Sequence, residues 1–364
     1  MAEQLKNLIN KENVGALATE IVKVEKSFDI QAFMAEIFDE YWDDLALTSR
    51  GNHITMTLGK FLPQDYPTAI GILEQVIDKA DSFLPVSLTA FIPEFGFDEQ
   101  HFDLSIKALK YFTQFGTSEF AVRPFIEKYE EKMIPIMLAW TTDENEHVRR
   151  LASEGCRPAL PWGKALQKYK KDPTPILPIL ENLRVDESLY VRKSVANNLN
   201  DISKTHPELV VEIAQKWLKE ENKHTDWIVK HACRTILKQG RPDALALFGY
   251  HDASAIEVTD FAIDKTALAI GEKLTFSFGL KANVETKIRL EFGIDYMKAN
   301  GKQNRKVFQI SETALKADEQ KNYTKKHAFG DLSTRKHYAG LHRVTLFVNG
   351  AERGTLDFEL TKEG

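Results

Sequence analysis

Residues 149–162 read RRLASEGCRPALPW, and the kind of fold follows from this segment. Its first half has the apolar spacing of a helix, with Leu151 and Ala152 on the same face as Val148 just before it. Its second half ends that helix, because a glycine and two prolines interrupt the periodic pattern. The stretch therefore predicts the second helix of a HEAT-type repeat, followed by a tight turn that ends in Trp162.

The same helical pattern returns twice further along the chain. Val148, Val191 and Val229 hold equivalent positions, 43 and 38 residues apart. These intervals match the period of about 40–47 residues of HEAT and armadillo helix pairs, the second being slightly short. Residues 1–245 are therefore expected to form an α-solenoid of HEAT-like repeats. An aspartate near the expected helix N-terminus precedes each valine: Asp143, Asp186 and Asp226.

A different pattern begins after Gly240-Arg241-Pro242. Short segments alternate between apolar and polar residues, and Asn300-Gly301 and Asn349-Gly350 between them favour tight turns. Residues 255–364 are therefore expected to form an all-β, immunoglobulin-like sandwich, without the paired cysteines of antibody domains. The predicted fold class is a multidomain protein in which the solenoid precedes the sandwich.

Length and composition limit the classes of protein to which the chain can belong. A sequence of 364 residues with 43% hydrophobic residues has enough apolar side chains for one large core or two smaller ones. No apolar run reaches the roughly 20 residues that span a bilayer, and the N-terminus lacks the apolar core of a signal peptide. Two cysteines offer neither a disulfide framework nor a metal site. We therefore expect a cytoplasmic protein that does not enter a membrane.

The formal net charge of −5 is unevenly distributed. Residues 1–139 contain 12 Lys and Arg against 22 Asp and Glu, which gives −10. Residues 140–241 contain 18 against 14, which gives +4, and residues 242–364 contain 18 against 17, which gives +1. A basic middle part is compatible with a polyanion that binds locally, but charge alone only weakly favours nucleic acid.

Two carboxylates fall on one side of the repeat helices. On a helical wheel, Glu154 lies beside Arg150 and away from the apolar stripe. In the next repeat, Asp201 lies beside Lys193 and Lys204 on the corresponding side. Because stacked repeats present corresponding sides on one concave surface, both acids are expected to face a common groove. The simpler alternative is that each acid is solvated or pairs with a neighbouring cation, and spacing alone favours that alternative.

Two further residues are candidates on weaker grounds. Trp162 follows a double-proline turn and would offer its ring to a sugar or a cationic base, although a tryptophan anchored in the core is the more common situation. Glu119 is expected to open a helix, where an acid in the first turn complements the helix dipole. Nothing in its surroundings marks Glu119 as catalytic.

Basic residues elsewhere are candidates for contacts with phosphate groups. Lys230, Arg234 and Lys238 are spaced at i, i+4 and i+8 and form one stripe on an expected helix. A solvated surface is the default interpretation of this stripe, and the basic loops of a sandwich are also solvated in most domains. The chain has no P-loop, dinucleotide-binding turn, HExxH or CxxC pair, and no metal or cofactor is expected. Several basic residues of the sandwich fall in presumed loops: Lys321, Lys325, Lys326, His327, Arg335, Lys336 and His337.

Three segments resemble the bacterial AlkC proteins, which are DNA alkylation-repair glycosylases of the HEAT-like repeat superfamily and relatives of AlkD. They are RRLASEGCRPALPW at 149–162, SEFAVRPF at 118–125 and VRKSVANNLND at 191–201. The resemblance covers the whole helical region, and the long combined motif is specific, whereas a HEAT repeat alone is not. The AlkC branch includes forms with an immunoglobulin-like C-terminal domain, which fits the pattern after residue 255.

The resemblance implies excision of cationic N-methylated bases from double-stranded DNA, notably 3-methyladenine, 3-methylcytosine and 1-methyladenine. By motif, Glu119, Glu154 and Asp201 would line the catalytic cleft with Trp162 beside them, and the chain departs from the family at none of these positions. Asp201 and Glu154 are expected to be the principal catalytic acids, Glu119 a supporting acid and Trp162 an aromatic wall. Family members are thought to act without flipping the damaged base into a pocket. A monomer without cofactor, associated with the nucleoid, is the default expectation. The candidate phosphate contacts are Arg150, Arg157, Lys193, Lys204, Lys230, Arg234, Arg335 and Lys336.

Two alternatives from other classes stay open at this point. A non-enzymatic HEAT scaffold would bind a protein or peptide along an apolar concave face, and it would tolerate Glu154→Gln and Trp162→Ala. A catalytically inactive reader of damaged DNA would keep the basic face and bind methylated duplex tightly without releasing a base.

Overall fold

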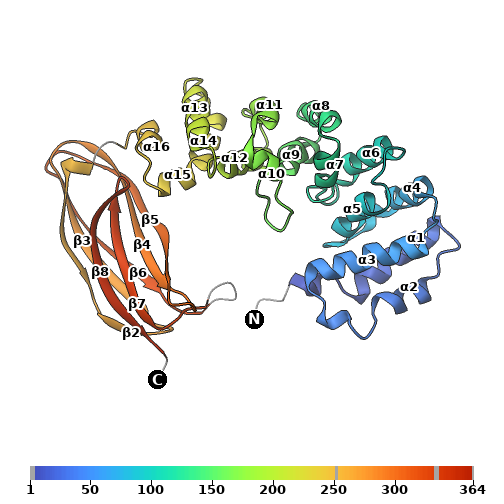
Figure 1. Cartoon of the computed structure of the whole chain (residues 1–364), viewed down its shortest axis with the longest axis horizontal. Helices are drawn as coiled ribbons and strands as arrows, with labels where there is room; N and C mark the ends of the chain where they lie inside the picture. Colours follow the sequence, from blue (N-terminus) through green and yellow to red (C-terminus); the bar gives the residue numbers. More distant parts are fainter. Residues whose placement is uncertain (1–4, 251–252, 332–335, 363–364) are drawn as a thin grey trace. The chain divides into compact units, whose positions relative to one another are not determined.

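The computed structural model describes residues 5–250, 253–331 and 336–362. Helices occupy the chain up to residue 247 and strands follow from residue 256 (Figure 1). The predicted fold class, HEAT-like helices followed by an immunoglobulin-like β part, is confirmed. Among the described residues, no helix is long and apolar enough to cross a membrane.

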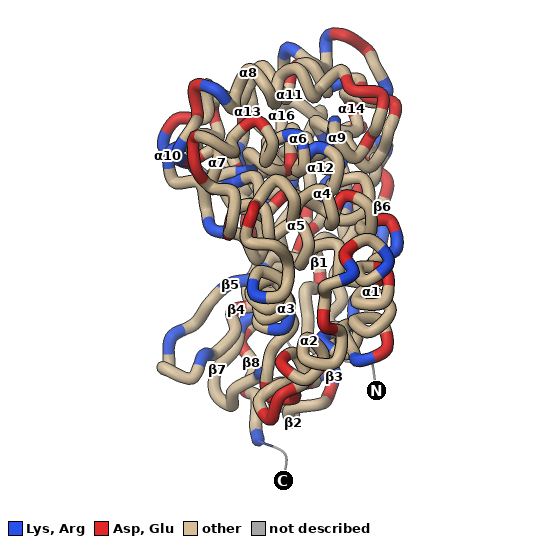
Figure 2. Tube along the Cα trace, turned by 90° about the vertical axis from the view of Figure 1, so that its right-hand side faces the viewer, with Lys and Arg blue, Asp and Glu red and all other residues tan. Residues whose placement is uncertain are grey.

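The chain forms two compact units. The first comprises Met1–Thr205 and Glu220–Ala232, and the second comprises His206–Lys219 and Cys233–Gly364. This division differs from the predicted domain limits of 1–245 and 255–364, because three α-helices before residue 248 group with the strands. The limits stay a prediction. Lys and Arg are interspersed with Asp and Glu along both units (Figure 2).

The first unit is a stack of short helices, in which α9 packs against α12 and α12 against α14. Val148, Val191 and Val229 lie in these three helices and are fully buried, so the repeat that the valines predicted is present. The α-helices of this unit are α1 (Lys11–Val24), α2 (Ile30–Ile37), α3 (Leu47–Phe61), α4 (Tyr66–Val76), α5 (Leu84–Phe95), α6 (Phe102–Phe112), α7 (Arg123–Lys128), α8 (Glu130–Trp140), α9 (Glu146–Gly155), α10 (Gln167–Lys171), α11 (Leu177–Asn182), α12 (Leu189–Ile202) and α14 (Lys223–Ala232).

Polar turns join one repeat to the next. The Asp143 carboxylate accepts a hydrogen bond from the amide of Asn145, and the Asp186 carboxylate also binds Arg149 of the preceding repeat at 2.7 Å. The third aspartate, Asp226, lies in the first turn of α14, near the helix N-terminus as predicted. The turn before α14 is closed by Asn222, whose side chain accepts from the amide of His224.

The contact between α9 and α12 is fixed by small polar side chains. The hydroxyl oxygens of Ser153 and Ser194 lie 2.6 Å apart, and the Asn198 amide donates to the carbonyl of Ser153 at 2.8 Å. All three side chains are buried, so sliding one helix along the other would leave polar groups without partners. This contact sets the positions of the residues that follow in both helices.

In its described residues, the second unit consists of two sheets, three α-helices and a short 3-10 helix at Ala253–Ala255. One sheet has the order β1-β3-β6, and the other has the order β2-β8-β7-β4-β5, with only β2 and β8 parallel among the described pairs. Buried aromatic and aliphatic residues of both sheets form its core. The elements are α13 (Pro207–Leu218), α15 (Arg234–Lys238), α16 (Pro242–Leu247), β1 (Ile256–Ile263), β2 (Ala267–Ala269), β3 (Lys273–Ala282), β4 (Thr286–Met297), β5 (Gln303–Leu315), β6 (Gln320–Ala328), β7 (Gly340–Val348) and β8 (Ala351–Thr361).

The turn predicted at Asn349-Gly350 joins β7 to β8, and both residues have the positive φ that such hairpins need. Gly350 also touches Gly240. A Cβ added to Gly350 would lie 2.6 Å from the Cα of Gly240. The two glycines therefore allow the end of α15 to approach the hairpin closely.

Two predictions about basic residues are wrong. Lys230 and Arg234 do not share one helix, because α14 ends at Ala232 and α15 begins at Arg234. The residues expected in a loop at 321–327 lie in β6, an edge strand paired only with β3 in the described part of the sheet. Lys321 and Lys326 are exposed in β6 and Lys325 is half-buried, and charged side chains of this kind are a common protection of an edge strand.

Candidate functional site

Both acids predicted from the helical wheel lie at the ends of their helices. Glu154 is the penultimate residue of α9, and Asp201 is the penultimate residue of α12. A carboxylate in the last turn of a helix meets the negative end of the helix dipole, which is unfavourable unless a cation compensates. That compensation is present at both acids.

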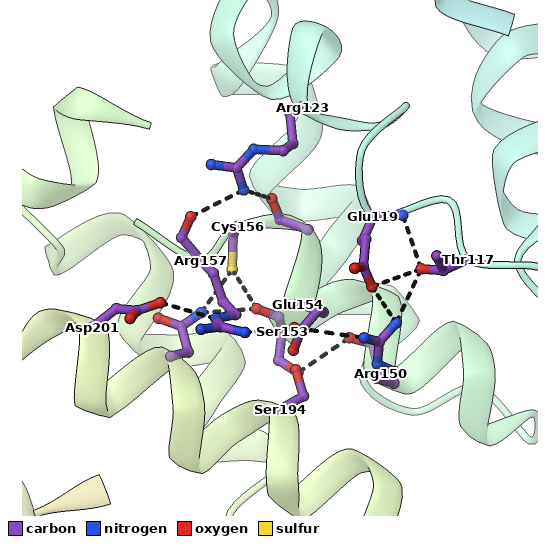
Figure 3. Close-up of polar contacts among 12 residues, drawn as sticks. Thr117, Glu119, Arg123, Arg150, Ser153, Glu154, Cys156, Arg157, Ser194 and Asp201 are labelled. Atoms are coloured by element: carbon purple, nitrogen blue, oxygen red, sulfur yellow. Dashed lines mark hydrogen bonds and ion pairs between the residues drawn. The ribbon is translucent and has the colours of Figure 1, made fainter. Parts of the chain in front are cut away.

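Arg157 supplies the compensating charge between the two helices. Its Nη1 lies 2.7 Å from Oε1 of Glu154, and its Nε donates to Oδ2 of Asp201 at 2.9 Å (Figure 3). The other oxygen of Asp201 binds Nζ of Lys204 at 2.8 Å. Burial alone would lower the pKa of Arg157, but the charges of Glu154 and Asp201 raise it above its usual value. Arg157 is therefore a fixed positive charge that links the two acids.

Arg150 extends the same network to a third acid. Its Nη1 lies 2.5 Å from Oε2 of Glu119 and donates to Oγ1 of Thr117 at 3.0 Å. Its Nη2 lies 3.5 Å from Oε1 of Glu154. The structure thus brings Glu119, Glu154 and Asp201 into one network of alternating charge, which Figure 3 shows from Asp201 on the left to Glu119 on the right.

The position of Glu119 differs from the prediction. Glu119 lies in a turn, and the following helix α7 begins only at Arg123. The dipole of α7 therefore does not account for Glu119. Its carboxylate instead accepts a hydrogen bond from Thr117 at 2.7 Å and pairs with Arg150.

All three acids are nearly inaccessible to water. Glu119, Glu154 and Asp201 are 8%, 5% and 4% exposed. Burying a carboxylate is costly unless a counter-charge and hydrogen bonds replace the water. The simpler interpretation is therefore wrong in expecting solvated acids. Its other half, pairing with a neighbouring cation, is confirmed, because Glu154 pairs with Arg150 at i, i+4 and Asp201 pairs with Lys204.

The turn after α9 is held by Arg123, which sequence reasoning missed. Its guanidinium is buried and donates to the carbonyls of Gly155, Arg157 and Lys164 at 2.6–3.0 Å. An arginine directly before a proline, inside the motif at 118–125, was the available signal. Arg123 therefore fixes both ends of the loop that carries Trp162.

Trp162 lies at the surface rather than in the core. Trp162 is 73% exposed, and its backbone has a φ of +63°. A left-handed conformation is unfavourable for a bulky residue and is maintained only where the surroundings enforce it. The interpretation of Trp162 as a core anchor is therefore wrong.

A groove of about 690 Å³ opens beside the network. One wall is charged and contains Glu119, Glu154 and Arg157, with Trp162 on the same side. Asp201 does not line the groove. Residues of α3, of α5 and of the position before α5 also line the groove, five of them apolar and four polar: Leu47, Thr48, Gly51, Asn52, Phe83, Val86, Ser87, Thr89 and Ala90.

Comparison with known proteins identifies relatives along the whole chain. A family model described as a DNA alkylation repair enzyme matches residues 93–236, and one described as the C-terminal Ig-like domain of uncharacterised protein YhaZ matches residues 257–362. The uncharacterized protein YhaZ of Bacillus subtilis (strain 168) is 46% identical over 356 residues, which cover 98% of this chain and 99% of that protein.

One solved structure agrees with the fold in full. It is the alkylpurine DNA glycosylase AlkC of Pseudomonas fluorescens, bound to DNA containing an abasic site analog. It has a TM-score of 0.94 and 37% sequence identity, and the match covers 99% of this chain and 100% of that chain. The chain belongs to the AlkC family of DNA alkylation repair enzymes.

In this AlkC-family chain, the candidate phosphate contacts separate into two groups. Arg150 and Arg157 are buried or nearly so, and their guanidinium groups bind the acids. The residues of the second group are at least partly exposed: Lys193, Lys204, Lys230, Arg234 and Lys336. Arg335 lies outside the described residues. Among the described residues, no group of His, Cys, Asp and Glu is arranged to hold a metal ion.

Proposed function

We propose that this protein is a monofunctional DNA glycosylase that hydrolyses the N-glycosidic bond of cationic N-methylated bases in double-stranded DNA. The bases proposed are 3-methyladenine, 3-methylcytosine and 1-methyladenine, and the product is an abasic site. The protein would act as a monomer on chromosomal DNA in the cytoplasm, without a cofactor and without flipping the damaged base.

The observation that carries the proposal is the placement of Glu119 and Glu154 on the wall of the groove. Cleavage of an N-glycosidic bond builds positive charge on the deoxyribose, as in other glycoside hydrolysis. Fixed carboxylates in a site with little water stabilise such charge strongly, because they do not need to reorganise during the reaction. A methylated cationic base already leaves well, so the reaction needs no strong general acid.

The ion pairs suggest different tasks for the acids. Within the described part of the chain, Glu154 pairs with Arg150 and with Arg157 through Oε1, and Oε2 would take the substrate or a water molecule. Asp201 has both oxygens in ion pairs and is assigned to hold Arg157, and through it Glu154, in place. In the proposed step, water adds to C1′, the electron pair of the C1′–N bond passes to the base, and a carboxylate accepts the proton of the water.

The remaining residues would hold the DNA. The exposed ring of Trp162 would face the sugar or the cationic base, where cation–π attraction contributes about 0.5–2 kcal/mol. The exposed cations Lys193, Lys204 and Lys230, and Lys336 of the sandwich, would contact phosphates.

A scaffold that binds a peptide is the competing function, and the apolar residues that α3 and α5 contribute to the groove favour it. A peptide groove, however, gives no reason to bury three carboxylates with their counter-ions, since apolar residues would fill that space at no cost in stability. The charged wall therefore supports the glycosylase.

Release of free methylated base from DNA treated with a methylating agent tests the proposal. We expect the wild type to release base and the Asp201→Asn variant to release at least about tenfold less. The neutral side-chain amide of this variant no longer compensates the positive charge of Arg157. No release from DNA with verified 3-methyladenine and 3-methylcytosine would instead favour a scaffold. Tight binding of that DNA without release would favour an inactive reader.

A further inference from the structure

We propose that Tyr190 is a positioning residue for the charged wall of the groove, acting through Arg150. The inference rests on the proposed glycosylase activity and concerns a residue that the acid network does not include. Tyr190 is the second residue of α12, and it reaches across to α9 of the preceding repeat.

The ring of Tyr190 covers the guanidinium of Arg150. The Arg150 Cζ lies 4.7 Å from the ring centroid, and the ring meets His147 edge-on at 5.5 Å. The edge of the guanidinium is occupied by Glu119, Glu154 and Thr117. Arg150 is therefore held at its edge by oxygen atoms and on its face by an aromatic ring.

The position of Arg150 determines the electrostatics of both glutamates. Arg150 pairs with both Glu119 and Glu154. A displacement of its positive charge would therefore change the electrostatic potential at both carboxylates. Without the ring, water would reach the face of the guanidinium, and the long side chain would regain rotamers in which it no longer bridges the two acids. The structure thus assigns Tyr190 to keep Arg150 in the bridging geometry.

The partial exposure of Tyr190 allows a second role, direct stacking on DNA. Tyr190 is 39% exposed, so part of its ring remains accessible. The two roles differ in what a substitution changes. A positioning residue alters the rate of the chemical step, whereas a DNA contact alters affinity.

The test uses single-turnover excision of 3-methyladenine at saturating protein, together with the Kd for the same duplex. We expect Tyr190→Ala to slow excision about three- to tenfold while Kd stays within about twofold, and Tyr190→Phe to behave as wild type. In an Arg150→Met background, Tyr190→Ala should cause no further loss, because both changes act on one interaction. Thermal melting confirms that each variant is folded.

Tyr111→Ala is the matched control, because Tyr111 is 38% exposed and packs against Phe112 and Phe115 rather than an arginine. The inference is overturned if Tyr190→Ala excises at the wild-type rate, if it changes only Kd, or if its effect adds fully to that of Arg150→Met. A wild type that releases no base would instead overturn the proposed function, so the two failures are distinguishable.

Discussion

Trp162 combines an unfavourable backbone with an exposed aromatic ring, and neither property helps the fold. We expect Trp162→Gly to change the free energy of unfolding by no more than about 0.5 kcal/mol, because glycine accepts a positive φ and little packing is lost. Excision should fall about tenfold, since the ring no longer faces the cationic substrate. Chemical denaturation and single-turnover excision measure the two effects. Unchanged excision by the glycine variant would remove Trp162 from the site.

Sequence reasoning reached individual residues only where a periodic pattern or a motif pointed to them. Glu154 and Asp201 followed from the helical wheel, since both lie to the same side of a clear apolar stripe. The role of Arg157 could not be predicted this way, because its guanidinium pairs with two acids that come from different helices. Its partners depend on how α9 packs against α12, and spacing in one helix carries no such information.

At the scale of elements, the approach of α9 to the Glu119 turn depends on Gly155. An added Cβ there would lie 2.6 Å from Cγ1 of the buried Val122. We expect Gly155→Ala to lower the free energy of unfolding by about 1–3 kcal/mol and to slow excision, because the turn that carries Glu119 is pushed away from Glu154.

Gly71→Ala is the control for this substitution. Gly71 lies inside α4, and an added Cβ would meet nothing within 4 Å. This variant should gain about 0.5–1 kcal/mol of stability and keep full activity. A Gly155→Ala variant with unchanged stability and activity would contradict the account of this contact.

The sandwich contains a histidine that can remain in place only while neutral. His342 is fully buried, its Nδ1 binds the carbonyl of Gly340, and its Nε2 accepts from the amide of Met297. Burial lowers its pKa below the ordinary value of 6.5, an effect that the nearby His337 increases and Gly340 and Glu359 oppose. The unfolded chain thus takes up this proton more readily than the folded chain.

Stability should therefore fall as the pH drops below about 6.5. The loss should end once the pH passes the lower pKa of the folded state. We expect thermal melting of His342→Gln to depend less on pH in this window than melting of the wild type. Equal pH dependence of the two proteins would show that His342 does not titrate between the folded and unfolded states.

Elements were predicted well where one pattern ran without interruption, and poorly where the chain breaks locally. The strands and the Asn349-Gly350 turn followed from alternation and turn chemistry. The break between Lys230 and Arg234 has no glycine or proline to signal it. The lysines of β6 were assigned to a loop because an exposed edge strand has few apolar residues to mark it.

For the whole molecule, the proposed binding of DNA depends on exposed lysines from separate parts of the chain. Each phosphate contact contributes about 0.9 to the slope of log Kd against log salt concentration. Replacing Lys193, Lys230 and Lys336 by glutamine should therefore lower that slope by up to about three. DNA binding measured at several salt concentrations gives the slope.

The control for this prediction removes the same charge from the acidic first part of the chain. Lys11, Lys23 and Lys26 are exposed residues of that part, and their replacement by glutamine should leave the slope nearly unchanged. Equal effects of the two triple variants would mean that only net charge matters, and that the three proposed lysines do not contact phosphates.

Excision of 3-methyladenine by Glu154→Gln shows whether the buried Glu154 carboxylate on the groove wall performs glycosylase chemistry. Asp186→Asn is the control, because Asp186 is also paired with an arginine between two repeats but does not line the groove. The account predicts wild-type excision by Asp186→Asn and a loss of about a hundredfold or more by Glu154→Gln, with DNA binding retained. Excision by Glu154→Gln at the wild-type rate would contradict it.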